Sequence, residues 1–265
     1  MAFYLIAPAP MYREKVAPAQ RLDGDETIGA PHCPPALVTC DNVPTIQLHS
    51  ERPAMTARLI VMDIDSTLIN QEVIDLLGEE AGVGGQVARI TERAMRGELD
   101  FKQALEERVG LLAGLDESVF ERTFERVTFT PGALELVRSA HSKGWKVGVV
   151  SGGFHEVADK IVAAAGIDFC LANRLEVVDG KLTGKLAADI VTKESKLIQL
   201  LDWAVECGVD MAHTVAIGDG ANDIPMIQAA GTGIAFCAKP KTREAAPFAI
   251  DERNLMLAMD IILRD

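Results

Sequence analysis

The sequence predicts an α/β fold in which helices flank an open parallel sheet. From Arg58 onward, short apolar runs alternate with amphipathic segments of helical length. This alternation is typical of parallel sheets, because each crossover helix returns the chain to the end of the sheet where the next parallel strand begins. Three of the apolar runs end in Asp, Ser or Gly, residues that line ligand sites beyond the strand ends of such folds. The expected core is therefore Rossmann-like.

The chain has 265 residues, of which 48% are hydrophobic, enough for one large domain or for a core with a smaller appendage. Its five cysteines are scattered without a CxxC pair, which favours reduced thiols and a cytoplasmic protein. No apolar run is long enough for a membrane span, and the N-terminus lacks the pattern of a secretory signal. The net charge of −13 argues against nucleic acid as a partner. We expect a small-molecule ligand and a monomer or homodimer.

The chain divides into an irregular N-terminal region and a longer region of alternating strands and helices. Residues 1–55 hold eight of the twelve prolines and are expected to be irregular, with short strands at 3–6 and 36–39. The predicted strands are 59–63, 146–150, 169–172, 214–217, 233–236 and 248–250. The predicted helices between the first two strands are 72–81, 86–95, 101–112 and 117–125, followed by a crossover helix that starts at Pro131.

Two insertions interrupt the regular alternation. Some eighty residues separate the first two strands, far more than one crossover helix needs. We interpret residues 73–127 as a helical cap inserted into a core of 56–72 and 128–265. A second insertion, at about 173–189, has two alternating runs around Asp179-Gly180, which predicts a β-hairpin.

The stretch LIVMDIDSTLINQE, residues 59–72, ends an apolar strand on two carboxylates. Side chains two apart on a strand point the same way, so Asp63 and Asp65 both project where the strand ends. A helix cap or a turn would explain an isolated DxDST equally well.

Three further segments favour a functional interpretation. In WKVGVVSGGF, Ser151, Gly152 and Gly153 follow a strand and could cradle an anion, although such turns often have steric reasons. In VAIGDGANDIPM, Asp219 and Asp223 lie beside Asn222, and acidic residues without Cys or His favour a hard cation such as Mg²⁺. Capping by Asn222 or Asp223 is the alternative there.

The fourth segment, DIVTKESKLIQLL, places Lys193 at the head of a helix. A lysine there opposes the helix dipole, which suggests a nearby anion, although first-turn lysines are common.

In this order, DIDST, VVSGG, Lys193 and GDGAND resemble the four motifs of the haloacid dehalogenase superfamily. Glu72, the stretch MRGELDF and Arg108 resemble one family within it, the phosphoserine phosphatases. The resemblance covers residues 58–265.

The resemblance implies a Mg²⁺-dependent hydrolysis of phosphoserine, the last step of phosphorylated serine biosynthesis. It implies that Asp63 is the nucleophile that forms an aspartyl-phosphate and that Asp65 is the acid and base. Metal ligands would be Asp63, Asp65 through its backbone carbonyl, Asp219 and Asp223. The implied phosphate-binding residues are Ser151, Gly152 and Lys193, and the substrate-binding residues are Glu72, Met95, Phe101, Arg108, Gly153 and Asn222.

The helix FKQALEERVGLL gives separate evidence about the substrate. At 100° per residue, Arg108 falls on the apolar stripe of Phe101, Ala104, Leu105 and Leu112. A cation on that stripe indicates an anionic partner, although a snorkelling arginine or a structural ion pair explains it as well. With Glu72 nearby, Arg108 could bind a carboxylate while Glu72 binds an ammonium. Phosphoserine carries both groups.

Two other functions are compatible with parts of the pattern. The nearer one is a related phosphatase or phosphotransferase acting on phosphothreonine, phosphoethanolamine or a similar monoester. The other is a phospho-acceptor signalling module, which also combines an acidic cluster, Ser or Thr and Lys on an open sheet. The helical insertion and the second aspartate argue against a signalling module, because such a module neither encloses a substrate nor protonates a leaving group.

Overall fold

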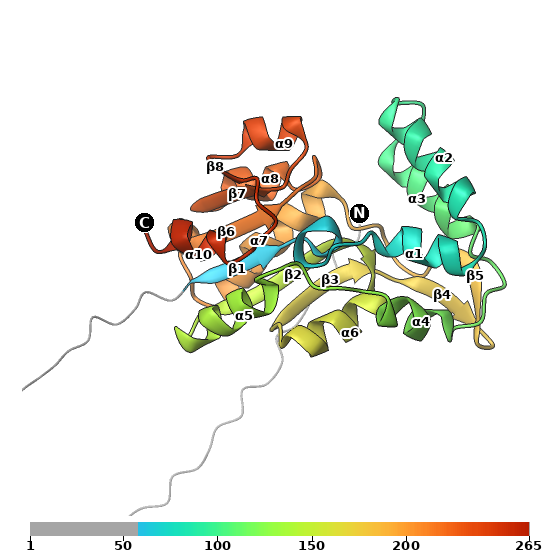
Figure 1. The fold of residues 1–265 in the computed structure, drawn as a ribbon, viewed down its shortest axis with the longest axis horizontal. Helices are drawn as coiled ribbons and strands as arrows, with labels where there is room; N and C mark the ends of the chain where they lie inside the picture. The colour runs from blue at the N-terminus through green and yellow to red at the C-terminus, as the bar shows by residue number, and fades with distance from the viewer. Residues whose placement is uncertain (1–57, 265) are drawn as a thin grey trace, which may run out of the picture. The chain divides into compact units, whose positions relative to one another are not determined.

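The computed structural model describes residues 58–264, and the expectations for residues 1–55 lie outside this range. Six parallel strands form one sheet in the order β3-β2-β1-β6-β7-β8 (Figure 1). They are β1 (Leu59–Met62), β2 (Lys146–Phe154), β3 (Phe169–Asn173), β6 (Thr214–Gly218), β7 (Thr232–Phe236) and β8 (Phe248–Ile250). This arrangement confirms the predicted α/β fold class.

Helices cover both faces of the sheet because successive strand residues point to opposite sides. On one face of the sheet, Ile60 and Met62 belong to an apolar cluster that includes residues of α5 (Ala133–Ser142), α6 (His155–Ala165) and α10 (Leu257–Ile262). Leu59 and Val61 pack into the second cluster with α7 (Lys193–Glu206) and α8 (Ile224–Ala229). The short α9 (Pro240–Ala245) follows β7. A strand buried on both faces explains why LIVM is continuously apolar.

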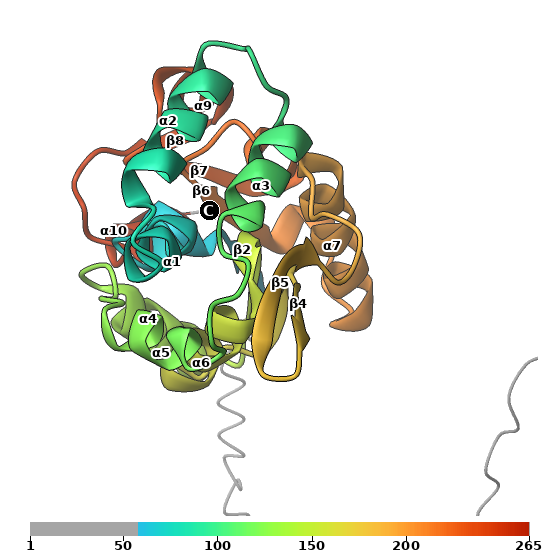
Figure 2. The same ribbon diagram turned by 90° about the vertical axis from the view of Figure 1, so that its right-hand side faces the viewer.

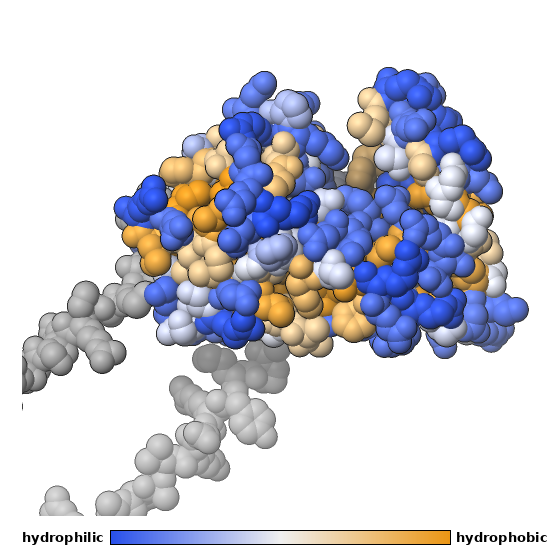
Figure 3. All heavy atoms as spheres, viewed as in Figure 1, coloured by the Kyte–Doolittle hydropathy of each residue, from blue (hydrophilic) through white to orange (hydrophobic). Residues whose placement is uncertain are grey.

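Four helices are inserted between β1 and β2, and we call this segment the cap. They are α1 (Val73–Glu80), α2 (Gly84–Met95), α3 (Phe101–Gly110) and α4 (Val119–Glu125). Asp100 and Gln103 form a capping box that starts α3. Figures 1 and 2 show α2 and α3 beyond the carboxyl ends of the core strands, and Figure 3 shows a cleft between these helices and the core.

The predicted hairpin is present as β4 (Leu175–Val178) and β5 (Lys181–Leu186). Asp179 and Gly180 both have positive φ, 51° and 73°, as a two-residue hairpin turn requires. The Leu182 N–H donates to Leu115 O, so the hairpin is hydrogen-bonded to the cap segment that follows α3. No helix among the described residues combines the length and apolar character needed to cross a membrane.

Candidate active site

The acidic pair lies at the carboxyl end of β1, the strand between β2 and β6 in the sheet. The backbone N–H of Asp63 donates to Ile217 O of β6 at 3.0 Å, which fixes the point where the chain leaves the sheet. Residues 64–68 then form a single wide turn closed by the bond from the Ile69 N–H to Ile64 O. This turn directs the chain from the sheet toward the cap.

The three aspartates of two distant segments meet here. One carboxylate oxygen from each of Asp63, Asp219 and Asp223 lies within 4.8 Å of the others. Gly218 permits this approach, because a Cβ at that position would lie 2.4 Å from Asp223 Cγ. Asp63 and Asp223 are buried, and no described residue donates a hydrogen bond to the Asp219 carboxylate.

The buried lysine of the site is Lys196, which corrects the prediction for Lys193. Its Nζ lies 2.8 Å from Asp63 Oδ2 and 2.7 Å from Asp223 Oδ1, and the side chain has no exposed surface. The Lys193 side chain is 58% exposed and has its ion-pair partner, Glu194, 3.6 Å away.

The helical period explains the difference between the two lysines. Lys196 lies on the same face of α7 as the buried Leu200, Trp203 and Ala204, whereas Lys193 occupies the first helical position and faces outward. The sequence contained this signal, since a lysine on the buried stripe of a helix needs a charged partner.

Lys196 is held in its charged form by the two carboxylates. Burial alone would lower the pKa of Lys196, but the charges of Asp63 and Asp223 raise it above its usual value. Burial also raises the pKa of Asp63 well above its usual value, although Lys196 opposes that rise. For Asp219, burial and the Asp223 carboxylate raise the pKa to about 6. More negative charge is gathered here than one lysine balances, so the cluster favours a cation.

Asp65 has a different environment from Asp63. Its Oδ1 accepts a hydrogen bond from the Val73 N–H at 3.0 Å, and its Oδ2 lies 3.5 Å from Ser151 Oγ. Burial raises the pKa of Asp65 to about 7, and the nearby Glu72 adds to the rise. A carboxyl group with this pKa can both donate and accept a proton near neutral pH.

The predicted anion cradle lies at the end of β2, which continues to Phe154 instead of stopping at residue 150. The pairing of β2 with β3 shifts register between Val150 and Phe154, and Ser151 lies in this irregular stretch. Ser151 Oγ is buried and accepts the Gly153 N–H at 2.8 Å.

The glycines of this stretch allow a close approach to Asp65. A Cβ on Gly153 would lie 3.0 Å from Asp65 Oδ2. Asn173, which the sequence analysis missed, donates from Nδ2 to Gly152 O at 2.8 Å and accepts the Val191 N–H at 2.7 Å. It joins the cradle to the segment that leads into α7.

Of the predicted substrate-binding residues, Glu72 immediately precedes α1 and Arg108 lies on α3 of the cap. Glu72 accepts a hydrogen bond from Ser66 Oγ at 2.8 Å. Arg108 is partly buried, as its place on the apolar stripe predicts, and its Nε donates to Ala104 O. Burial lowers the pKa of Arg108, while the charges of Asp75, Glu72 and Asp65 oppose this. No carboxylate of the described residues lies within ion-pair distance of Arg108.

The remaining predicted substrate-binding residues are Phe101, Met95 and Asn222, of which Phe101 and Asn222 lie beside glycines of the site. Phe101 Cζ lies 3.6 Å from the position that a Cβ on Gly152 would occupy, so the first residue of α3 reaches the cradle. Phe101 is 44% exposed and Met95 77% exposed, so neither belongs to the core of the cap. Asn222 is partly buried, and its Oδ1 lies 2.4 Å from the position of a Cβ on Gly220.

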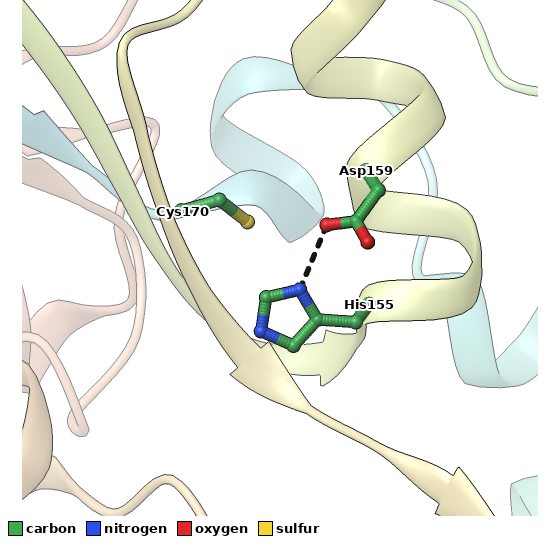
Figure 4. Close-up of side chains that lie close together, drawn as sticks. All are labelled: His155, Asp159 and Cys170. Carbon is green, nitrogen blue, oxygen red and sulfur yellow. Dashed lines mark hydrogen bonds and ion pairs between the residues drawn. The ribbon is translucent and has the colours of Figure 1, made fainter.

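A second group of possible metal ligands, His155, Asp159 and Cys170, lies at α6 and β3 (Figure 4). His155 Nε2 accepts the Ala172 N–H at 3.1 Å, which places the ring proton on Nδ1. Nδ1 then donates to Asp159 Oδ1 at 2.8 Å. Both ring nitrogens are therefore used, and burial raises the pKa of the Cys170 thiol to about 12. In the observed arrangement His155 has no free ring nitrogen for a metal, and the Cys170 thiol stays protonated, so these three residues do not form a metal site.

Known proteins are similar to this chain in sequence and in fold over about three quarters of its length. A family model described as haloacid dehalogenase-like hydrolase matches residues 60–228. A phosphoserine phosphatase from Streptococcus thermophilus is 60% identical over 204 residues, which make up 77% of this chain and 95% of that protein.

Two solved structures are similar in fold and sequence. A substrate-bound phosphoserine phosphatase complex has a TM-score of 0.74 and 43% identity, and the match covers 78% of this chain and 98% of the other. A phospho-aspartyl intermediate analogue of phosphoserine phosphatase has a TM-score of 0.73 and 43% identity, with coverages of 78% and 99%.

Proposed function

This chain belongs to the haloacid dehalogenase-like hydrolases, in the phosphoserine phosphatase family, and on that premise we propose that it hydrolyses O-phospho-L-serine to serine and phosphate. The observation that carries the proposal is the meeting of Asp63, Asp219, Asp223 and Lys196 at the end of β1, with Ser151 beside Asp65. We place the reaction at the last step of phosphorylated serine biosynthesis.

The acidic cluster suits Mg²⁺ as the cofactor. Its ligands would be carboxylate oxygens of Asp63, Asp219 and Asp223 with the backbone carbonyl of Asp65, an all-oxygen set that hard cations prefer. The Asp219 carboxylate, which receives no hydrogen bond from the described residues, supports this assignment. When bound, the metal neutralises charge on the cluster and on the phosphoryl oxygens.

Asp63 supplies the nucleophile in the first step. Its carboxylate attacks phosphorus while the bond between phosphorus and the serine oxygen breaks, which leaves an aspartyl-phosphate. Asp65 gives its proton to the departing serine oxygen. In the second step Asp65 takes a proton from water, whose oxygen attacks phosphorus and releases phosphate and the Asp63 carboxylate. A pKa of about 7 for Asp65 supports both roles.

Lys196 takes the phosphate-binding role that the sequence analysis gave to Lys193. Its buried Nζ lies beside Asp63 and can stabilise the charge that develops on the phosphoryl oxygens during transfer. Ser151 Oγ and the backbone around Gly152 and Gly153 would bind the remaining oxygens, and Asn222 would support the loop that carries Asp223.

Arg108 and Glu72 would distinguish phosphoserine from other monoesters. Arg108 lacks a carboxylate partner among the described side chains and would bind the substrate carboxylate. Glu72 would bind the ammonium group, while Met95 and Phe101 would close the cap, residues 73–127, over the substrate. We further propose a cytoplasmic monomer or homodimer, which agrees with the unpaired Cys170, Cys207 and Cys237.

The test measures phosphate release by wild type, Asp63→Asn and Arg108→Ala, with Mg²⁺ and with EDTA. We expect wild type to turn over phosphoserine repeatedly and only with metal, and Asp63→Asn to be nearly inactive. Arg108→Ala should lose activity on phosphoserine but not on phosphoethanolamine, which has no carboxylate. Equal activity of Asp63→Asn and wild type would exclude the covalent mechanism. A wild-type preference for phosphoethanolamine would favour a different substrate.

A further inference from the structure

Two short linkers connect the cap to the core, and they pair with each other. Ile69 and Phe129 form an antiparallel bridge. The Asn70 N–H donates to Thr128 O, and the Thr130 N–H donates to Leu68 O, both at 3.0 Å. The two segments that join the cap to the core are therefore hydrogen-bonded to each other.

Arg253, which follows β8 and is remote in sequence, bonds to both linkers. Its Nη1 donates to Asn70 Oδ1 at 3.1 Å and approaches Thr130 Oγ1 at 3.5 Å. Its Nη2 donates to Ser66 O at 3.2 Å. The guanidinium also lies over the Phe236 ring, 6.0 Å from its centroid, which restricts where it can move. A single side chain thus bonds to the outgoing linker, the returning linker and the turn that carries Asp65.

The bond to Ser66 leads directly to Glu72. Ser66 has a φ of 56°, a conformation that a non-glycine residue keeps only when its surroundings hold it. Its N–H donates to Gln71 O at 3.2 Å, and its hydroxyl donates to Glu72 Oε1 at 2.8 Å. Arg253 holds the carbonyl of the same residue. Loss of Arg253 would remove one of the bonds that hold Ser66, the residue whose hydroxyl is bonded to the Glu72 carboxylate.

We propose that Arg253 is a positioning residue that holds the two cap linkers together and orients Glu72 through Ser66. The first part rests on the contacts alone, and the second rests on the proposed function, in which Glu72 binds the substrate ammonium. Arginine suits this position because its planar group presents several donors in fixed directions, whereas lysine offers one ammonium that cannot reach separated acceptors together. Arg253 lies on the surface, so its effect on global stability should be small.

Steady-state kinetics on phosphoserine test the route through Glu72. The variants are Arg253→Ala, Arg253→Lys, Glu72→Gln and the double variant Arg253→Ala/Glu72→Gln. The control is Arg243→Ala, which removes another exposed arginine of the same region, one that pairs with Asp251. We expect Arg253→Ala to raise KM about tenfold with kcat changed by less than about threefold, since one or two charged hydrogen bonds are lost. Arg253→Lys should restore only part of the loss.

The double variant separates positioning from an independent effect. In the Glu72→Gln background, Arg253→Ala should raise KM by less than about twofold, because residues that act through each other are not additive. Additive effects, or full activity of Arg253→Ala, would overturn the route through Glu72. If wild type does not hydrolyse phosphoserine at all, the proposed function fails instead. The role of Arg253 at the linkers is then tested by hydrogen exchange alone.

Hydrogen exchange tests the linkers without any substrate. Peptides covering residues 66–72 and 127–131 should exchange at least about tenfold faster in Arg253→Ala than in wild type, and no faster in Arg243→Ala. Unchanged exchange of both peptides in Arg253→Ala would overturn the claim that Arg253 holds the linkers together.

Discussion

Replacing Lys196 by methionine should damage both stability and activity. Methionine is close to lysine in side-chain length, but the substitution removes the only cation within 3 Å of Asp63 and Asp223 among the described residues. Two buried carboxylates would then face each other without a counter-charge. Breaking a buried ion pair from one side typically costs about 3–5 kcal/mol of unfolding free energy. Bound Mg²⁺ should restore part of this loss.

The loss of activity should exceed the loss expected from unfolding alone. Removing one buried donor aimed at developing charge costs about 2.7–4 kcal/mol in the transition state, or about 10²–10³ in kcat. Urea unfolding followed by circular dichroism gives the stability, and phosphate release at saturating Mg²⁺ gives kcat of the folded fraction. Lys196→Arg keeps the charge and should unfold at a urea concentration closer to that of wild type.

Lys193→Met is the matched control, because it removes an equal charge three residues away on the same helix. With its side chain 58% exposed, it should change kcat by less than about twofold. The reasoning is refuted if Lys196→Met keeps wild-type kcat, or if Lys193→Met is the variant that loses activity.

Two further predictions concern the geometry and the charge of the acidic cluster. Gly218→Ala places a Cβ 2.4 Å from Asp223 Cγ, so it should lower kcat about 10²-fold and weaken activation by Mg²⁺. The control is Gly85→Ala, whose Cβ meets no atom within 4 Å and which should leave kcat and Mg²⁺ activation unchanged. Equal kinetics of the two variants would contradict this prediction. Because the pKa values of Asp65 and Asp219 are raised to about 7 and about 6, the folded metal-free protein binds more protons than the unfolded chain between about pH 4 and 7. Their contribution to stability therefore falls as pH rises through that window, so with EDTA the wild-type Tm should decline relative to that of Asp65→Asn, and Mg²⁺ should reduce the decline. A difference that is independent of pH would show that Asp65 does not titrate as described.

Most of the core could be predicted from sequence because its signals are local. An apolar strand followed by Asp63 or Asp219 identifies a strand end, and parallel strands bring their carboxyl ends to one edge, although β2 continues past Ser151 to Phe154. The hairpin at Asp179-Gly180 follows from the turn chemistry of two residues. The segments that carry Asp63, Ser151 and Asp219 therefore meet in space although more than 150 residues separate the first from the last.

The errors and omissions arose where tertiary contacts decide a residue's role. Lys193 was chosen for its position at the start of a helix, whereas burial on the face shared with Leu200 selects Lys196. Arg253 carries no local signal, because its partners Ser66 and Asn70 lie more than 180 residues earlier. The contacts of Arg253 with Ser66 and Asn70 form only once the cap linkers are folded against the segment that follows β8.

The most direct test of the proposed chemistry is to trap the phosphoryl group on the enzyme. Wild type is mixed with radiolabelled phosphoserine and Mg²⁺, quenched in acid within one turnover, and digested for peptide mapping. We predict label on Asp63, in the peptide that contains residues 59–72, and none in Asp63→Asn or in EDTA. Label on another residue, or turnover of phosphoserine by Asp63→Asn, would contradict the assignment of Asp63 as the nucleophile.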